Sequence, residues 1–214
     1  MAKVIAFLRC ARCLIEVKAK KKLGYFLLDS ELKDENFICL VGKNGSGKTS
    51  LLNIIAGVYK PDEGYVKINS ETITDVSVEK KQVVLVTPDS CLPNFNVDKH
   101  LVWGAKLRKK HVADEAVMEV RKSLGINYQG KVSKLSLGMK ERVSLATVLL
   151  ASPKVILIDE AFGNIDNRTE FITAYREFAR KSMIDVIFST QHTEDSKCAD
   201  HLYQMEQGRA TRVF

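Results

Sequence analysis

The sequence lacks any apolar run long enough to cross a membrane. A membrane-spanning helix needs about 20 consecutive apolar residues, whereas the clear runs here, such as residues 155–158, have the length of a core strand. Residues 4–8 are apolar too, but they are too few for the core of a signal peptide, and basic and cysteine residues follow them directly. We therefore expect a cytoplasmic chain that reaches a membrane only through a partner.

Cysteines are few, and acidic residues are outnumbered by basic ones. The chain has five cysteines, an odd number at scattered positions, which suits a reducing compartment better than a disulfide framework. Cys10 and Cys13 form a single CxxC pair without a second pair or nearby histidines, so a structural or incidental role outweighs metal binding. Lys and Arg outnumber Asp and Glu by 33 to 26, with basic runs at residues 18–22 and 108–110. Such runs are usually solvated faces, so we expect no nucleic-acid partner.

The apolar residues that are present form two kinds of pattern. Four near-continuous runs predict strands of a parallel sheet buried on both faces, at residues 37–41, 83–86, 155–158 and 186–188. Helical spacing lies between them, at residues 51–56, 113–124 and 139–150, each followed closely by glycine or proline. The fold class is therefore α/β, in a chain whose 214 residues and 45% hydrophobic content suit one compact domain.

Two smaller units are expected beside this core. Three segments resemble antiparallel strands and predict a small N-terminal β-subdomain, at residues 13–18, 25–32 and 65–68. Residues 101–128 hold mainly helix formers and predict a helical subdomain inserted between core strands, within the wider bounds of residues 98–150.

A glycine-rich loop stands between the first core strand and the first helix. It fits the pattern GxxxxGK[ST] through Gly42, Lys43, Asn44, Gly45, Ser46, Gly47, Lys48 and Thr49. Glycines let backbone N–H groups turn inward around phosphates, and the helix that begins at Ser50 adds partial positive charge. Lys48 would contact the β- and γ-phosphates, and the Thr49 hydroxyl would coordinate Mg²⁺. The strand, loop and helix together predict ATP binding.

Two adjacent acids, Asp159 and Glu160, end the apolar strand at residues 155–158. Neighbouring residues on a strand point to opposite sides, so the two carboxylates can do different work. We expect Asp159 to hold Mg²⁺ and Glu160 to polarise an attacking water as general base. ATP hydrolysis is the predicted reaction.

The order and spacing of these elements resemble the ATP-binding subunits of ABC transporters from residue 14 to residue 209. Two further runs carry the resemblance, at the places of the signature and the D-loop: Leu135-Ser136-Leu137-Gly138-Met139 and Gly163-Asn164-Ile165-Asp166. The resemblance implies one ABC-type domain over residues 1–214, with a P-loop NTPase core and a helical subdomain that bears the signature. It also implies a membrane permease as partner and a head-to-tail pair, either a homodimer or a heterodimer with another ABC ATPase subunit. In that pair Ser136 and Gly138 would complete the opposite ATP site.

Within the family, residues 20–26 look most like the molybdate and tungstate importers. This resemblance makes Tyr25 or Phe26 the candidate to stack on adenine, with Phe26 preferred and core packing as the alternative for either ring.

Three positions depart from the family pattern. Pro88 stands where the family carries a glutamine, with Asp89 beside it as a possible oxygen ligand. Leu137 replaces the first glycine of the signature, which would be costly if that position needs a positive φ. His192, the candidate for the family's catalytic histidine, follows Ser189-Thr190-Gln191 and so stands one residue later than usual.

These departures leave two hypotheses for the chain. The first is an ATP-hydrolysing subunit that powers a separate membrane permease from the inner face of the cell membrane. The second is a regulatory or weakly hydrolysing subunit that pairs with a distinct ATPase chain. A soluble ABC-type protein of repair or translation ranks last, because the sequence has no second ATPase half and no long coiled-coil insertion. The transported substrate is set elsewhere in such systems.

Overall fold

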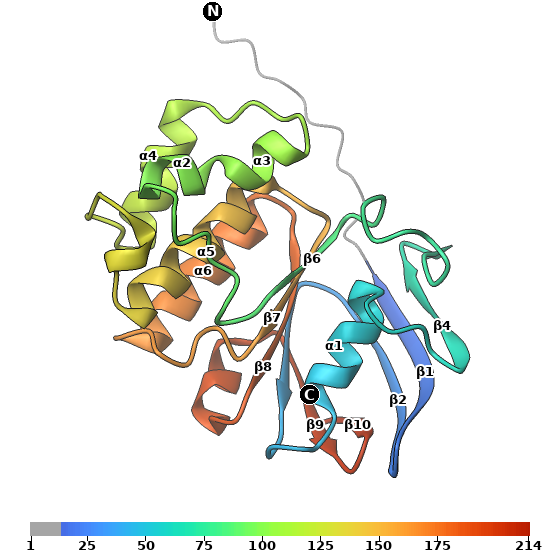
Figure 1. Cartoon of the computed structure of the whole chain (residues 1–214). Coiled ribbons are helices and arrows are strands. Elements are labelled where there is room, and N and C mark those ends of the chain that lie inside the picture. The colour runs from blue at the N-terminus through green and yellow to red at the C-terminus, as the bar shows by residue number, and fades with distance from the viewer. Residues whose placement is uncertain (1–13) are drawn as a thin grey trace, which may run out of the picture.

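The computed structural model describes residues 14–214, in which two β-sheets are packed with helices between and outside them (Figure 1). Cys10, Cys13 and the apolar residues 4–8 lie outside the described residues. Between residues 14 and 214 no helix combines the length and the apolar character that crossing a membrane requires.

The larger sheet has six strands in the order β10-β9-β3-β8-β7-β6. Their bounds are β3 Phe37–Val41, β6 Val83–Val86, β7 Val155–Asp159, β8 Asp185–Thr190, β9 His201–Glu206 and β10 Arg209–Arg212. All pairs are parallel except β9 with β10, which is antiparallel. The four predicted core strands are therefore confirmed, and β9 and β10 are additions that the apolar pattern did not reveal.

The smaller sheet is antiparallel and has the order β2-β1-β4-β5. Its bounds are β1 Ile15–Leu23, β2 Phe26–Asp34, β4 Glu63–Ile68 and β5 Glu71–Thr72. The predicted N-terminal β-subdomain is confirmed, although β1 continues to residue 23 instead of ending at residue 18. A tight turn closes the β1–β2 hairpin, because Leu23 pairs directly with Phe26.

The helices form layers around the larger sheet. Helix α1 (Lys48–Ala56) lies between the two sheets, whereas α5 (Leu137–Ala151) and α6 (Arg168–Lys181) lie on the opposite face (Figure 1). Three shorter helices gather at one end of the molecule: α2 (Val97–Leu101), α3 (Trp103–Leu107) and α4 (Asp114–Ser123). Two 3₁₀ turns, η1 (Val132–Lys134) and η2 (Thr193–Cys198), complete the elements.

The continuous apolar strands are explained by a core on each face of the larger sheet. In β3, Phe37, Cys39 and Val41 belong to the core under α5 and α6, whereas Ile38 and Leu40 belong to the core under α1. Every β3 side chain is thus buried, which removes the alternation seen in a half-exposed strand. Because β3, β8 and β7 run parallel, their carboxyl ends meet at one edge of the sheet, where α1 begins. In open α/β sheets this edge is where ligands bind.

Candidate functional site

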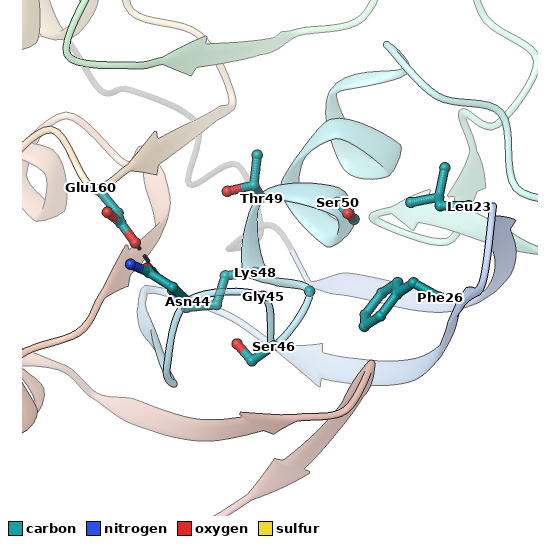
Figure 2. Close-up of a pocket in the computed structure, with 10 residues that line it drawn as sticks. Leu23, Phe26, Asn44, Gly45, Ser46, Lys48, Thr49, Ser50 and Glu160 are labelled. Carbon is teal, nitrogen blue, oxygen red and sulfur yellow. Dashed lines mark ion pairs between the residues drawn. The ribbon is translucent and has the colours of Figure 1, made fainter.

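The loop between β3 and α1 forms one wall of a cavity of about 370 Å³ (Figure 2). Gly47 caps α1 with a φ of 107° and ψ of 4°, a left-handed backbone that other residues rarely adopt. A helix N-terminus therefore opens into the cavity with its backbone N–H groups free for an anion. The cavity is lined by Leu23, Phe26, Asn44, Gly45, Ser46, Gly47, Lys48, Thr49, Ser50 and Glu160.

Lys48 connects the loop to the acid on the opposite wall. Its side chain is only 4% exposed, and its Nζ donates to the carbonyls of Gly42 at 2.7 Å and Lys43 at 3.1 Å. The same Nζ lies 3.5 Å from Glu160 Oε1 (Figure 2). The cavity wall thus holds a positive charge beside a negative one.

Asp159 and Glu160 diverge for a different reason from the one the sequence suggested. Asp159 is the last residue of β7, whereas Glu160 has already left the strand and has a φ of 54°. The opposite directions therefore do not come from strand alternation. Glu160 holds a left-handed backbone, which is disfavoured for a residue with a Cβ and is one of the strained conformations that occur at functional sites.

Ser189, at the end of β8, fixes both acids. Its hydroxyl accepts from the Glu160 N–H at 3.1 Å and donates to Asp159 Oδ1 at 2.7 Å. The parallel register makes this possible, since Asp159 lies opposite Ser189. Sequence analysis missed Ser189, because a hydroxyl next to a strand end has no pattern of its own.

The oxygen donors around the loop suit a hard cation. Thr49 is exposed in the first turn of α1 and lines the cavity, whereas Asp159 is not on the cavity wall. The buried hydroxyl of Ser46 has no hydrogen-bond partner among residues 14–214. Hydroxyl and carboxylate oxygens are the ligands that Mg²⁺ prefers. In the same part of the chain no three His, Cys, Asp or Glu side chains lie close enough to hold a metal ion together.

The structure separates the two aromatic candidates for adenine. Phe26 lines the cavity, and its ring lies so near the loop that a Cβ on Gly47 would come within 3.0 Å of it. Tyr25 is fully exposed at the hairpin turn and is absent from the cavity wall. Phe26 is therefore the ring that a bound base could meet.

The signature segment begins α5, away from this cavity. Ser136 is the N-cap of the helix, and its Oγ accepts from the Met139 N–H at 3.3 Å, as expected for a cap. Leu137 is 62% exposed and has no positive φ, so its replacement of glycine does not strain the backbone. Neither Ser136 nor Gly138 lines the cavity, which means that one chain does not bring them to Lys48.

Helix α5 instead packs tightly on the D-loop. A Cβ on Gly138 would lie 2.3 Å from the Asn164 carbonyl oxygen, so this position accepts only glycine without a shift. Glu141, 2% exposed, accepts from the Asn164 N–H at 3.1 Å and from its Nδ2 at 2.7 Å. Burial raises the pKa of Glu141, and the two hydrogen bonds from Asn164 only partly oppose that rise.

The segment after β8 differs most from what the sequence suggested. Gln191 Nε2 lies 3.2 Å from Glu160 Oε1 and 3.1 Å from Oε2. His192 is exposed, its backbone N–H donates to Thr190 Oγ1 at 3.0 Å, and its imidazole makes no hydrogen bond or ion pair within residues 14–214. The contact with Glu160 thus comes from Gln191. The additional residue before the histidine was the signal that could have found it.

Pro88 and Asp89 belong to a turn that faces solvent. The turn is closed by the Thr87 N–H, which donates to Ser90 Oγ at 2.9 Å, and it is fixed to α5 by Ser144 Oγ, which donates to the Ser90 carbonyl at 2.9 Å. The Asp89 carboxylate is exposed and bonds to no other group among residues 14–214.

A glycine-rich loop between a buried strand and a helix, with an internal lysine and a carboxylate at the end of β7 on the same sheet edge, is the arrangement of a P-loop nucleotide-binding protein. The chain belongs to the ABC transporter family, whose domain matches residues 27–163, more than half of its length.

Several curated proteins are similar to this chain. The molybdate/tungstate import ATP-binding protein WtpC of Pyrococcus abyssi is 34% identical over 85% of this chain and 55% of its own length. WtpC of Archaeoglobus fulgidus is 30% identical over 91% of this chain and 84% of its own length. The sulfate/thiosulfate import ATP-binding protein CysA of Bacillus cereus is 34% identical over 82% and 53%. The chain thus spans about half the length of two of these three relatives.

Solved structures agree on the fold. An ATP-binding cassette of an ABC transporter in its ADP conformation has a TM-score of 0.76 and 23% identity, and the match covers 94% of this chain and 90% of that one. A bacterial Atm1-family ABC exporter with ATP bound has a TM-score of 0.78 and 21% identity over 95% of this chain and 39% of its own. The P-loop NTPase core with its antiparallel sheet and helices is therefore the fold of ATP-binding cassettes.

Proposed function

We propose that this chain binds and hydrolyses ATP in an ABC importer and powers a separate membrane permease. The observation that carries the proposal is the cavity in which the glycine-rich loop, Lys48 and Glu160 meet, with Lys48 Nζ 3.5 Å from Glu160 Oε1. The names of the relatives, all import ATP-binding proteins, support this hypothesis over a regulatory subunit.

In the proposed reaction the loop from Gly42 to Thr49 cradles the phosphates of ATP. Lys48, now bonded to loop carbonyls, moves its donors to the β- and γ-phosphates and stabilises the charge that develops during transfer. Glu160 orients a water molecule and accepts its proton as the water oxygen bonds to the γ-phosphorus, while the bond from that phosphorus to the β-phosphate oxygen breaks and ADP leaves. The ring of Phe26 stacks on the adenine.

Thr49 and Asp159 are the residues that would hold Mg²⁺. When bound, the ion neutralises phosphate charge. Ser189 keeps Asp159 in position, because its hydroxyl donates to one carboxylate oxygen and leaves the other available as a ligand.

The signature acts on a second subunit. Ser136 and Gly138 lie outside the chain's own cavity, so their contribution requires a head-to-tail pair in which they complete the ATP site of the opposite subunit. We propose one ATP-binding domain whose α2–α5 region carries these residues. The pair, as homodimer or heterodimer, sits at the inner face of the membrane through its permease.

The names of the relatives support a proposal for the substrate class. Molybdate, tungstate, sulfate and thiosulfate occur in their names, and all are oxyanions. We propose that the permease served by this chain imports an oxyanion of this kind.

The test is purification of the chain from its own cells with membrane proteins retained. We expect an integral membrane permease to co-purify and the complex to hydrolyse Mg·ATP, whereas Lys48→Ala should lose nucleotide binding and hydrolysis together. A complex that forms normally but never binds ATP would contradict the proposal.

A further inference from the structure

The contact between Gln191 and Glu160 is the starting point. The Gln191 amide nitrogen lies within hydrogen-bond distance of both Glu160 carboxylate oxygens, at 3.2 and 3.1 Å. A carboxylate accepts hydrogen bonds and does not donate them, so the amide nitrogen must face it. With Lys48 at 3.5 Å, these are the side-chain groups that hold the Glu160 carboxylate.

Hydrogen bonds hold the backbone of residues 190–192 in place. Thr190 Oγ1 donates to Asp195 Oδ2 at 2.7 Å and accepts from the His192 N–H at 3.0 Å. Asp195 is 1% exposed, and Arg168 Nε donates to its other oxygen at 2.8 Å. These hydrogen bonds fix the residues on both sides of Gln191, so the backbone from which its side chain extends to Glu160 is held in place.

The same anchoring fixes the backbone of His192. Its backbone N–H is bonded to Thr190, and the residue caps the 3₁₀ turn η2 in an extended conformation. The amide that contacts Glu160 and the imidazole that is exposed to solvent therefore belong to adjacent residues.

We propose that Gln191 is a positioning residue that orients the Glu160 carboxylate toward the attacking water. The inference rests on the proposed ATP hydrolysis and adds a residue that nothing in the family match assigns. The amide nitrogen contacts both carboxylate oxygens from one side, and this shared hydrogen bond restricts rotation of the carboxylate about its terminal bond. The amide is uncharged at every accessible pH, so it orients the base without neutralising it.

The proposal predicts the effect of three substitutions at residue 191. Gln191→Ala removes both hydrogen bonds and should lower kcat about 10- to 100-fold with KM for ATP changed less than about threefold. Gln191→Asn keeps the amide but shortens its reach, so its loss should be smaller than that of Gln191→Ala. Gln191→His supplies one N–H and should restore part of the rate, while adding a pH dependence near the usual imidazole pKa of about 6.5.

The experiment measures steady-state hydrolysis of Mg·ATP between pH 5.5 and pH 9, the window in which an imidazole but not an amide titrates. The purified chain is assayed with the proteins that co-purify with it. Gln204→Ala is the matched control, because Gln204 is an exposed glutamine of β9 that lines a different cavity. Thermal unfolding of each variant should match that of the unmodified chain, since Gln191 is exposed.

The outcomes separate this inference from the proposed function. An unmodified complex that binds ATP but releases no phosphate overturns ATP hydrolysis and the role of Gln191 with it. Hydrolysis that Gln191→Ala retains at the level of Gln204→Ala overturns the role of Gln191 alone. The role is equally contradicted if His192→Ala lowers kcat more than Gln191→Ala does. Loss of kcat in Gln191→Ala with the graded order Gln, Asn, Ala supports it.

Discussion

The contact between Glu141 and Asn164 predicts that two substitutions of the same side chain will behave differently. Glu141 is 2% exposed on α5 and accepts both the backbone and the side-chain N–H of Asn164, at 3.1 and 2.7 Å. Glu141→Ala removes two hydrogen bonds, each of which contributes about 1 kcal/mol net to stability. It also removes one buried methylene, which contributes about 0.8 kcal/mol. Because Asn164 is exposed and water can replace part of the loss, we expect a free energy of unfolding lower by about 2 kcal/mol.

Glu141→Gln should cost much less. Its amide oxygen can still accept from Asn164, and its neutral group avoids the desolvation that raises the pKa of Glu141. We expect the free energy of unfolding of Glu141→Gln to stay within about 1 kcal/mol of the unmodified chain at pH 7.

The pH dependence gives the sign of the electrostatic contribution. A folded-state pKa above the ordinary glutamate value of 4.5 means that the folded chain binds the proton more tightly than the unfolded chain. The stability that this proton supplies is fully present below pH 4.5 and is lost as the pH rises through the folded pKa. As the pH falls, the free energy of unfolding of the unmodified chain should therefore rise relative to that of Glu141→Gln.

Urea unfolding followed by circular dichroism at several pH values measures all three chains. Hydrogen exchange at the Asn164 amide reports the contact itself, and it should be faster in Glu141→Ala than in Glu141→Gln. The reasoning is refuted if Glu141→Ala stays within about 0.5 kcal/mol of the unmodified chain, the range of ordinary surface substitutions.

Three further predictions concern the cavity, the signature and a buried histidine. Phe26→Ala should weaken ATP binding about fivefold, because about 1 kcal/mol of ring contact is lost. Tyr25→Ala should leave the affinity unchanged, and fluorescence titration of both variants with an ATP analogue measures the difference. Gly138→Ala should destabilise the chain by about 1–3 kcal/mol, because its Cβ would lie 2.3 Å from the Asn164 carbonyl oxygen, and an unchanged melting temperature would be inconsistent with that contact. His100 accepts from the Leu92 N–H at 3.0 Å and contacts Thr147 Oγ1 at 2.8 Å, and burial lowers its pKa below 6.5. Its neutral form therefore stabilises the fold above about pH 6.5, and this contribution should be lost as the pH falls through the folded pKa. In the same urea experiments, the free energy of unfolding of His100→Gln should depend less on pH.

Much of the site could be predicted from local sequence. The apolar run of β3, the glycine pattern and the first helix follow one another without interruption, so their geometry depends on neighbours along the chain. The cap at Ser136 is local for the same reason, since its partner is the N–H three residues later. The structure extends α1 back to Lys48, two residues before the predicted start at Ser50.

The missed features depend on contacts between distant segments. Ser189 meets Asp159 only because β7 and β8 pair in a particular register, and no local pattern specifies that register. Gln191 reaches Glu160 because Glu160 leaves β7 with a left-handed backbone, which its sequence does not announce. The elements α6, β9 and β10 were missed because their apolar residues are mixed with many polar ones.

The central claim is that Glu160 activates the water that hydrolyses ATP. The direct measurement is phosphate release from saturating Mg·ATP by the unmodified chain and by Glu160→Gln, with nucleotide binding measured in parallel. We expect Glu160→Gln to bind ATP as before. Its rate of hydrolysis should be lower by a factor of about 100 or more, the loss expected when a general base is removed. Phosphate release by Glu160→Gln at the unmodified rate would contradict the account.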